Sequence, residues 1–349
     1  LRSHQIFSAC PVGENSLAFG TIRGGVVITT ATGELIQHLD KNNGLQNNTV
    51  LSITTDRKGN LWMGLDNGID FAEISSPLTF LHHPGGFGTG YAAAIHNGYL
   101  YLGTNNGLFA SPWSPANTGS QPSFRLVPHT VGQVWHLSVH ADQLLCGHDN
   151  GTYLVRGMEA TRISTERGAW TFIELSRHPG KLIGGTYEGL TLYQYLPALK
   201  RWEFVKLLPG FRESSRVMEE DREGNLWMTH GFKGAFKIKL SDQADSVIQT
   251  EYYNTEKGFV TNNYINVYKI DNQPVFSARE GIFTYNGATN LFARDTLLEK
   301  RFGTHEHISY IRQDEKRNIW FVAGNKPALL RWGEDGRHTD AVQAFRYAL

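Results

Sequence analysis

Residues 50–69 read VLSITTDRKGNLWMGLDNGI, and the order of apolar and turn-forming residues in this stretch decides the fold. Two apolar runs flank the polar turn Asp56–Asn60, and a second turn ends at Gly68. β-Branched and aromatic residues favour strands, whereas Asp, Asn and Gly favour tight turns. The stretch therefore predicts consecutive antiparallel hairpins, with four strands in this unit at about 50–55, 60–64, 68–73 and 78–82.

The same order of residues returns along the chain. Each copy has apolar residues, a small residue, a short polar segment, a glycine and apolar residues again. The mean spacing of about 43 residues is the length of a four-stranded propeller blade. The small residue of the successive copies stands at Gly20, Gly64, Gly103, Gly147, Gly185, Thr229, Ser277 and Ala323.

No window of the sequence keeps a helical apolar period over three turns. We therefore predict an all-β chain, a β-propeller of four-stranded antiparallel blades with eight repeat units, and keep a seven-bladed ring as the alternative. Trp62, Trp227 and Trp320 are expected to be core wedges between blades. Residues 1–349 are expected to form a single β-propeller domain, with repeat units at about 5–45, 46–87, 88–132, 133–168, 169–213, 214–260, 261–306 and 307–349.

The charge balance excludes several classes of function. Lys plus Arg and Asp plus Glu each total 33, so the formal net charge is zero. Nucleic acids and anionic membrane surfaces both select for basic faces, so we expect neither to bind through this chain. No run of about 18 apolar residues is present, so no membrane-spanning segment is expected either.

The sequence offers little metal or catalytic chemistry. Cys10 and Cys146 form neither a zinc set nor a disulfide framework, and are expected to be small buried hydrophobes. No His-Glu-x-x-His motif, phosphate loop or Gly-x-Ser-x-Gly elbow is present. His305-x-His307 allows a metal pair, but solvated or packed histidines are the default. We therefore expect no metal, no cofactor and no catalytic residue.

The turn residues, read together, resemble a known family. The segments NGLQNNTV at 43–50, DRKG at 56–59 and NLWMG at 60–64 resemble the two-component regulator propeller repeat. Further matches run from 218 to 227 and from 258 onward. Other units keep the rhythm but depart in letters: Thr229, Ser277 and Ala323 replace the usual glycine.

That repeat builds the sensor ectodomains of bacterial hybrid histidine kinases and of related membrane-bound transcription regulators. The resemblance implies a periplasmic sensor domain in signal transduction, which binds a ligand that is often carbohydrate-derived. The expected partners are a small-molecule ligand, an oligosaccharide among the options, and a neighbouring propeller or β-sandwich domain of the full-length receptor, with a homodimer as a further option. The chain is expected to be an excised propeller portion.

Binding residues are expected on one face of the propeller, where the second-to-third strand turns meet the loops that enter each innermost strand. Loops on a rigid scaffold commonly carry function. Aromatic rings stack on the C–H face of a sugar, while polar groups satisfy its hydroxyls. The candidate ligand-binding residues are Tyr91, Trp135, Trp170, Tyr187, Arg216, Tyr264, Arg279 and His305.

Three functions compete. The first is a non-catalytic ligand-sensing module, and the second is a protein-interaction or dimerisation scaffold of the same receptor. The third, a polysaccharide-active propeller enzyme, needs a carboxylate pair about 5–10 Å apart. The candidate carboxylates on the binding face, Asp66, Glu188 and Glu280, belong to different, non-adjacent units. We therefore expect ligand sensing rather than an enzyme.

Overall fold

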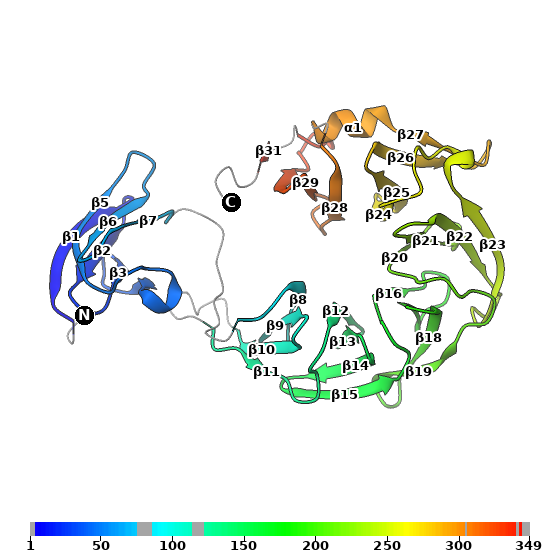
Figure 1. The fold of residues 1–349 in the computed structure, drawn as a ribbon, viewed down its shortest axis with the longest axis horizontal. Helices are drawn as coiled ribbons and strands as arrows, with labels where there is room; N and C mark the ends of the chain where they lie inside the picture. The colour runs from blue at the N-terminus through cyan, green and yellow to red at the C-terminus, as the bar shows by residue number, and fades with distance from the viewer. Residues whose placement is uncertain (1–3, 75–85, 114–121, 304–305, 340–341, 344–349) are drawn as a thin grey trace. The chain divides into compact units, whose positions relative to one another are not determined.

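The computed structural model describes residues 4–74, 86–113, 122–303, 306–339 and 342–343. Their strands form seven four-stranded antiparallel sheets and one three-stranded sheet (Figure 1). Within each sheet the strands are hydrogen-bonded in chain order. The predicted fold class, an all-β propeller built from four-stranded antiparallel blades, is confirmed.

The chain divides into two compact units, Leu1–Leu102 with Leu108–Val127, and Gly103–Gly107 with Pro128–Leu349. The expected strand at 78–82 lies outside the described residues. That the whole chain is one propeller domain stays a prediction. The strands of the first unit are β1 (Ile6–Val12), β2 (Ser16–Thr21), β3 (Val26–Thr30), β4 (Leu35–Leu39), β5 (Val50–Thr55), β6 (Leu61–Leu65), β7 (Ile69–Ala72), β8 (Gly90–His96), β9 (Tyr99–Thr104), β10 (Leu108–Pro112) and β11 (Arg125–Leu126). The end of β9 belongs to the second unit. The 3-10 helix η1 (Lys41–Asn43) follows β4.

The second unit contains five successive sheets. Their strands are β12 (Val134–His140), β13 (Gln143–His148), β14 (Gly151–Arg156), β15 (Glu159–Ser164), β16 (Thr171–Glu174), β17 (Lys181–Thr186), β18 (Gly189–Leu196), β19 (Arg201–Leu207), β20 (Val217–Glu220), β21 (Leu226–His230), β22 (Gly234–Leu240), β23 (Val247–Tyr253), β24 (Asn266–Ile270), β25 (Gln273–Ala278), β26 (Gly281–Asn286), β27 (Leu291–Arg294), β28 (Ile308–Gln313), β29 (Ile319–Ala323), β30 (Lys326–Leu330) and β31 (Val342–Gln343). The 3-10 helix η2 (Thr255–Lys257) follows β23, and the helix α1 (Thr296–Phe302) follows β27.

Two of the small residues in second strands, Gly147 and Gly185, are explained by the backbone that passes over them. A Cβ added at Gly147 would overlap the backbone carbonyl of Ala169, and one added at Gly185 would overlap that of Ser215. Ala169 and Ser215 lie just before β16 and β20, the first strands of the following sheets. Glycine therefore lets the chain that enters the next sheet lie directly against the previous one.

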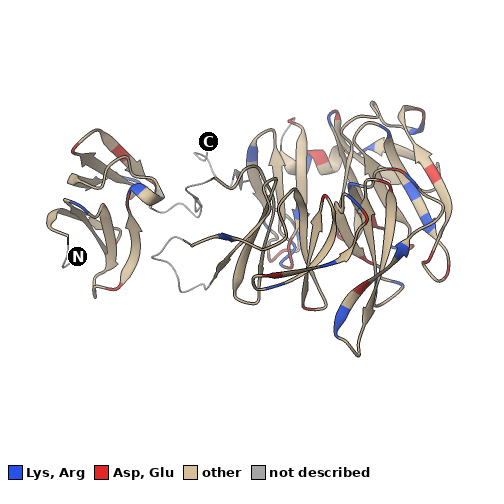
Figure 2. Cartoon of the chain, turned by 60° about the horizontal axis from the view of Figure 1, so that its bottom comes forward, with Lys and Arg blue, Asp and Glu red and all other residues tan. Residues whose placement is uncertain are grey.

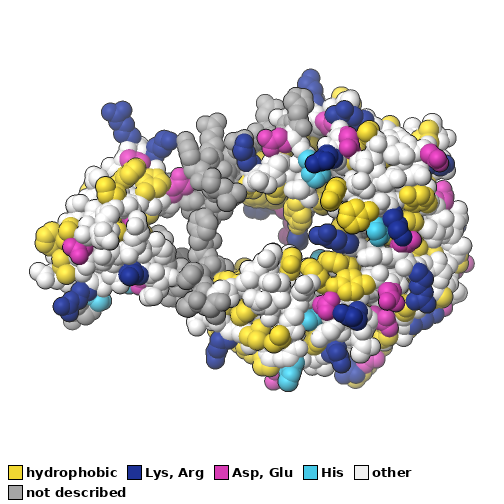
Figure 3. Space-filling view, in the orientation of Figure 1, with side chains coloured by type: hydrophobic (Ala, Val, Ile, Leu, Met, Phe, Trp, Pro, Cys, Tyr) yellow, Lys and Arg dark blue, Asp and Glu magenta, His cyan; other side chains and the backbone are white. Residues whose placement is uncertain are grey.

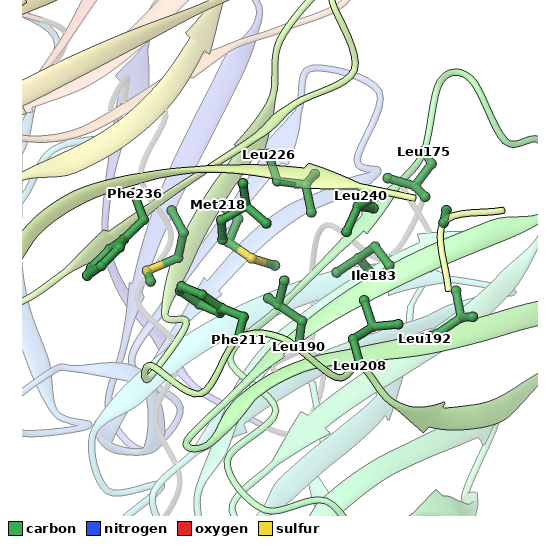
Figure 4. Packing of buried hydrophobic residues seen from close by; sticks show 13 residues of the cluster. Leu175, Ile183, Leu190, Leu192, Leu208, Phe211, Met218, Leu226, Phe236 and Leu240 are labelled. Carbon is green, nitrogen blue, oxygen red and sulfur yellow. The ribbon is translucent and has the colours of Figure 1, made fainter. Parts of the chain in front are cut away.

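Apolar side chains fill the space between consecutive sheets of the second unit. Figure 4 shows one such core, where Ile183 and Leu190 of one sheet meet Met218 and Leu226 of the next. All four are buried. Burying a side chain of this kind stabilises the fold by roughly 1.5–3 kcal/mol, so these layers bind neighbouring sheets together.

The three tryptophans expected as core wedges differ in burial. Trp227 is 1% exposed and packs against rings of the next sheet, including Phe276 and Phe292. Trp62 and Trp320 are 44% and 39% exposed, so the expectation is wrong for these two. Trp62 has its ring contact with Phe71, on the adjacent strand of its own sheet, which leaves part of the indole in solvent.

Helix α1 is an insertion that the strand repeat does not predict. Asp295 caps it by accepting a hydrogen bond from the backbone N–H of Leu298 at 2.9 Å, and Gly303 ends it in the left-handed conformation. Phe302 anchors the helix in the core against Phe321. None of the helices that the structure describes is long and apolar enough to span a membrane.

Candidate functional site

The first strands β12, β16, β20, β24 and β28 lie side by side in chain order and form the inner edge of the second unit. Because each hairpin reverses the chain, the segment entering a first strand lies at the same end as the turn between the second and third strands. We call this end of the second unit the entry face. Trp170, just before β16, accordingly donates its backbone N–H to the carbonyl of Gly185, at the end of β17.

Three predicted binding residues meet on the entry face. Trp135 lies where the pairing of β12 and β13 shifts register, a bulge of the kind that redirects side chains. Its ring stacks on Trp170 with 4.2 Å between centroids and 34° between planes. The ring of Tyr187, from the β17–β18 turn, meets Trp170 edge-on at 5.4 Å. The loop that enters one sheet and the turn of the same sheet thus form one aromatic cluster.

A polar chain fixes this cluster. The indole N–H of Trp135 donates to the Tyr187 hydroxyl at 3.2 Å, and that hydroxyl donates to Asp149 Oδ1 at 2.8 Å. Arg167 pairs with the other oxygen of Asp149 at 3.3 Å. Burial and the hydrogen bond to Asp149 raise the pKa of Tyr187 to about 12, so its hydroxyl remains a neutral donor at physiological pH. A side chain at Gly168 would overlap the Tyr187 ring.

Arg216, a fourth predicted residue, joins the cluster from the segment before β20. Its guanidinium lies over the Trp170 ring, 5.2 Å from the centroid, in a cation–π arrangement. The indole N–H of Trp170 is buried without a hydrogen-bond partner among the described residues. Trp170 is thus surrounded by Trp135, Tyr187 and Arg216, which makes it a support for the site rather than an open platform.

An exposed aromatic pair lies one sheet further along the entry face. Phe232 in the β21–β22 turn and Tyr264 before β24 are 66% and 57% exposed, with their rings edge-on at 5.9 Å. Tyr264 has a φ of 55°, a strained value for a bulky residue. Its backbone N–H donates to the carbonyl of Gly231 at 2.9 Å, which holds the pair in place.

Charged side chains line the inner edge beside these aromatics. Glu219 on β20 pairs with Lys269 on β24 at 3.9 Å. Burial raises the pKa of Glu219 to about 7, although the charges of Lys269 and Arg312 act in the opposite direction. Burial, with the charges of His140 and Arg312, lowers the pKa of His136 to about 4, so this imidazole is neutral.

Sequence reasoning missed this charged group. Glu219, Lys269 and Arg312 each interrupt a short apolar first strand. A charged residue at that position is a usable signal, because a lone charge is costly to bury unless it is paired or functional. Their meeting depends on strands about fifty residues apart, which no local pattern reveals.

The remaining candidate residues do not join the aromatic cluster. Tyr91 belongs to β8 in the first unit, and His305 lies outside the described residues. Arg279 lies at the β25–β26 turn, in a pocket of about 60 Å³ that Glu280 and Glu306 also line. Ligand sites for small molecules typically measure roughly 300–1,000 Å³, so this pocket is too small to hold a sugar.

The described residues hold no group of three or more His, Cys, Asp or Glu side chains arranged to bind a metal ion. Positive and negative side chains are interspersed over each unit (Figure 2), in keeping with the balanced composition. The features that the entry face offers a ligand are therefore aromatic rings, hydrogen-bonding groups and guanidinium groups.

Comparison with known proteins matches one short stretch of the chain to a family model. Residues 44–67 match the family model described as two component regulator propeller. This stretch holds the Asp56 turn, Trp62 and the small residue Gly64. No curated protein matches the sequence of the chain significantly.

Two solved structures resemble the chain over nearly its whole length. One is the extracellular domain of a protein named as a hybrid two component system of B. thetaiotaomicron, 18% identical with a TM-score of 0.64, covering 96% of this chain and 46% of that chain. Another, from a protein named as a one component system of the same organism, is 18% identical with a TM-score of 0.54, covering 97% of this chain and 48% of that chain. The chain thus spans about half the length of either structure, and the likeness shows the propeller fold.

Proposed function

Because the chain carries a repeat of the two component regulator propeller family, we propose that it is a ligand-sensing propeller module of a bacterial two-component-type receptor. The module is non-catalytic and periplasmic, and it binds a carbohydrate or a related metabolite. Structural neighbours that are extracellular domains support a location outside the cytoplasm. Binding shifts the population toward one arrangement of the receptor, which is the signal.

The observation that carries the proposal is the exposed aromatic pair on the entry face. Phe232 and Tyr264 present large apolar rings to solvent at the tip of a turn and a loop, where they are 66% and 57% exposed. Both rings are rigid and amphipathic or apolar, which suits stacking on the C–H face of a sugar. The adjacent cluster around Trp170 fixes the position of Arg216, a multiple hydrogen-bond donor.

A scaffold function is the second candidate, and a separate observation favours it. In the first unit, Trp62, Ile69 and Phe71 are 44%, 67% and 47% exposed on β6 and β7. An apolar surface of this kind is typical of protein–protein contacts. Dimerisation of the chain without ligand, abolished by a charge at Ile69, would favour this function.

An enzyme is disfavoured by the placement of the carboxylates. Asp66 follows β6 in the first unit, Glu188 lies in the β17–β18 turn, and Glu280 lies in the β25–β26 turn. Glu188 and Glu280 thus belong to sheets separated by a whole further sheet, β20–β23. This is not the facing pair that acid–base cleavage of a glycosidic bond needs.

The test is calorimetric titration of the chain with a panel of oligosaccharides. The expected result is saturable binding to the wild-type chain. The affinity is expected to fall at least about tenfold in Phe232→Ala and in Tyr264→Ala, since buried aromatic contacts are frequent binding hot spots. Tyr252→Ala is the matched control, because Tyr252 is 43% exposed but lies on the outer strand β23. If the variant that combines Phe232→Ala and Tyr264→Ala binds with unchanged affinity, or if no member of the panel binds to the wild-type chain, the proposal is refuted.

A further inference from the structure

We propose that His230 is a further ligand-binding residue, whose imidazole Nε2–H donates a hydrogen bond to a hydroxyl of an uncharged saccharide stacked on Phe232 and Tyr264. This inference rests on the proposed function and deepens it, because it names a residue that sets specificity and a class of ligand. Three observations support it: the contact of His230 with the exposed aromatic pair, the unused second nitrogen of its ring, and the balanced charge around it.

His230 is the last residue of β21 and adjoins the turn that carries half of the exposed pair. Its ring meets the Phe232 ring edge-on, with 6.4 Å between centroids. Its Nδ1 accepts a hydrogen bond from the backbone N–H of Phe232 at 3.2 Å. Gly231, which lies between these two residues, accepts the backbone N–H of Tyr264 at 2.9 Å. A saccharide stacked on the pair is therefore within reach of the imidazole.

The second nitrogen of the His230 ring is left unused by the chain. A neutral imidazole has one N–H and one acceptor nitrogen. Because Nδ1 accepts from Phe232, the proton lies on Nε2. Nε2 has no hydrogen-bond partner among the described residues and is not one of their buried atoms, so it faces solvent. The site thus offers one N–H donor whose orientation is fixed by a bond on the opposite side of the ring.

The same position in other sheets shows what the turn itself requires. Thr104 and Thr186, which end β9 and β17, accept from the backbone N–H two residues later at 3.1 and 3.2 Å. A hydroxyl therefore suffices to close this turn. His148, which ends β13, accepts in the same way at 3.1 Å, but it is 1% exposed and its Nε2 lies 3.3 Å from the carbonyl of Thr130. Closing the turn thus accounts for one nitrogen of His230 and leaves the other for a partner outside the chain.

The charges around His230 are balanced. Lys233, in the same turn, pairs at 2.8 Å with Glu213 from the segment before β20. Burial and the charge of Lys233 lower the pKa of His230, although the charge of Glu213 acts in the opposite direction, so the imidazole is neutral at physiological pH. On the face that Figure 3 shows, basic and acidic side chains lie interspersed over the second unit. A neutral ring beside a paired cation and anion favours a ligand without net charge.

Stacking and N–H donation recognise different parts of a saccharide. Aromatic rings contact its C–H face, whereas a hydroxyl at the ring edge accepts a hydrogen bond. An aromatic surface alone discriminates little between sugars that share such a face. A fixed donor discriminates strongly, because a sugar that lacks the matching hydroxyl leaves the donor unpaired on binding. His230 is therefore the residue that selects among sugars that stack equally well on the pair.

The experiment uses two substitutions that each keep one half of the imidazole. Asparagine places its amide where Nδ1 lies, and can close the turn as Asn47 does for the backbone N–H of Thr49 at 3.0 Å. Glutamine reaches the position of Nε2 and keeps the outward N–H, but does not close the turn. The full chain and both variants are titrated calorimetrically with cello-, xylo-, malto- and mannotetraose, and with tetragalacturonate as the acidic member of the panel.

The two variants are expected to separate binding from stability. His230→Asn should lower the affinity for an uncharged tetraose about fivefold without changing the midpoint of urea unfolding, because a donor is lost and the turn bond is kept. His230→Gln should lower the midpoint and bind within about twofold of the wild type. His178→Asn is the matched control and should change neither quantity, because His178 lies between β16 and β17, at the opposite end of its sheet.

The outcomes distinguish the two proposals. If Phe232→Ala weakens a tetraose and His230→Asn binds it like the wild type, the role of His230 is refuted and the sugar-sensing function stands. A loss of affinity in His230→Gln that equals or exceeds the loss in His230→Asn would show that the histidine acts only by closing the turn, and would also overturn the inference. Binding of tetragalacturonate alone would refute the uncharged ligand class. If no saccharide binds to the folded chain, both proposals are refuted.

Discussion

The carboxylate of Asp221 accepts a hydrogen bond from the indole N–H of Trp227, six residues later, at 2.9 Å. The same carboxylate accepts from the backbone N–H of Asn225 at 2.8 Å. One acidic side chain thus closes the turn between β20 and β21 and also positions a ring in the core. The turn recurs with Asp56 and Trp62, and with Asp314 and Trp320.

Replacing this carboxylate is expected to destabilise the fold according to the burial of the tryptophan. Asp221→Ala leaves the N–H of a fully buried indole without a partner, and we expect a loss of about 2–3 kcal/mol. Asp56→Ala is expected to cost about 1 kcal/mol or less, since water reaches the half-exposed Trp62. Urea unfolding of the two variants measures the difference, and equal losses would contradict the role of the buried indole.

A methyl group at Gly185 is expected to force two sheets apart. Gly185→Ala places a Cβ against the backbone carbonyl of Ser215, which cannot rotate away. Overpacking of this kind costs roughly 1–3 kcal/mol. Gly90→Ala is the control, because an added Cβ there meets no atom within 4 Å. The midpoint of urea unfolding should fall for Gly185→Ala and stay near the wild-type value for Gly90→Ala.

Removal of the Tyr187 hydroxyl is expected to destabilise the aromatic cluster while the ring stays in place. Tyr187→Phe keeps the ring against Trp170 but takes the acceptor from Trp135 and a donor from Asp149. We expect a loss of about 1–2 kcal/mol of unfolding free energy, measured by urea denaturation. Because the pKa of Tyr187 is about 12, this loss should be constant between pH 6 and pH 9. A loss that disappears within that range would contradict the assignment.

Stability is expected to fall with rising pH through the titration of Glu219. Its pKa is about 7 in the folded chain, whereas an unfolded glutamate has a pKa of about 4.3. The folded state therefore binds the extra proton between these values, and the free energy of unfolding decreases as pH rises from about 4 to 7. The side chain is still 29% exposed, so we expect about 1–2 kcal/mol rather than the full effect.

Glu219→Gln is the variant that tests this origin. The amide does not titrate, so the variant should lose less stability than the wild type between pH 5.5 and pH 8 in urea unfolding. The other titrating groups are common to both chains and cancel in the comparison. Parallel pH profiles for the two chains would show that Glu219 does not bind the proton.

The sheets were predictable from the sequence because their determinants are local. The turn from Asp221 to Asn225 and the glycine after each second strand act within a few residues, and they recur at blade length. Helix α1 was not predictable in this way, since its seven residues are too few for a helical period. Its cap, Asp295, is the local signal that marks it.

The site was predictable only in part. Trp135, Trp170, Tyr187 and Arg216 are predictable because turns and entering loops share one end of a blade, and the structure places them together. Which ring is covered could not be foreseen, because that depends on the bulge in β12 and on the packing of neighbouring sheets. The charged residues of the inner edge could not be grouped from the sequence, because Glu219, Lys269 and Arg312 lie on three separate sheets.

The backbone contacts at Gly147 and Gly185 also imply an order in which the sheets assemble. Gly147 is synthesised before Ala169, and Gly185 before Ser215, the residues whose backbone rests on them. The sheets that contain Gly147 and Gly185 therefore each provide a docking surface for the sheet that leaves the ribosome next. Nearest-neighbour docking of this kind lets repeat proteins fold by propagation. A ribosome that stalls between two repeats would accordingly hold a nascent chain whose newest sheet has its apolar face uncovered.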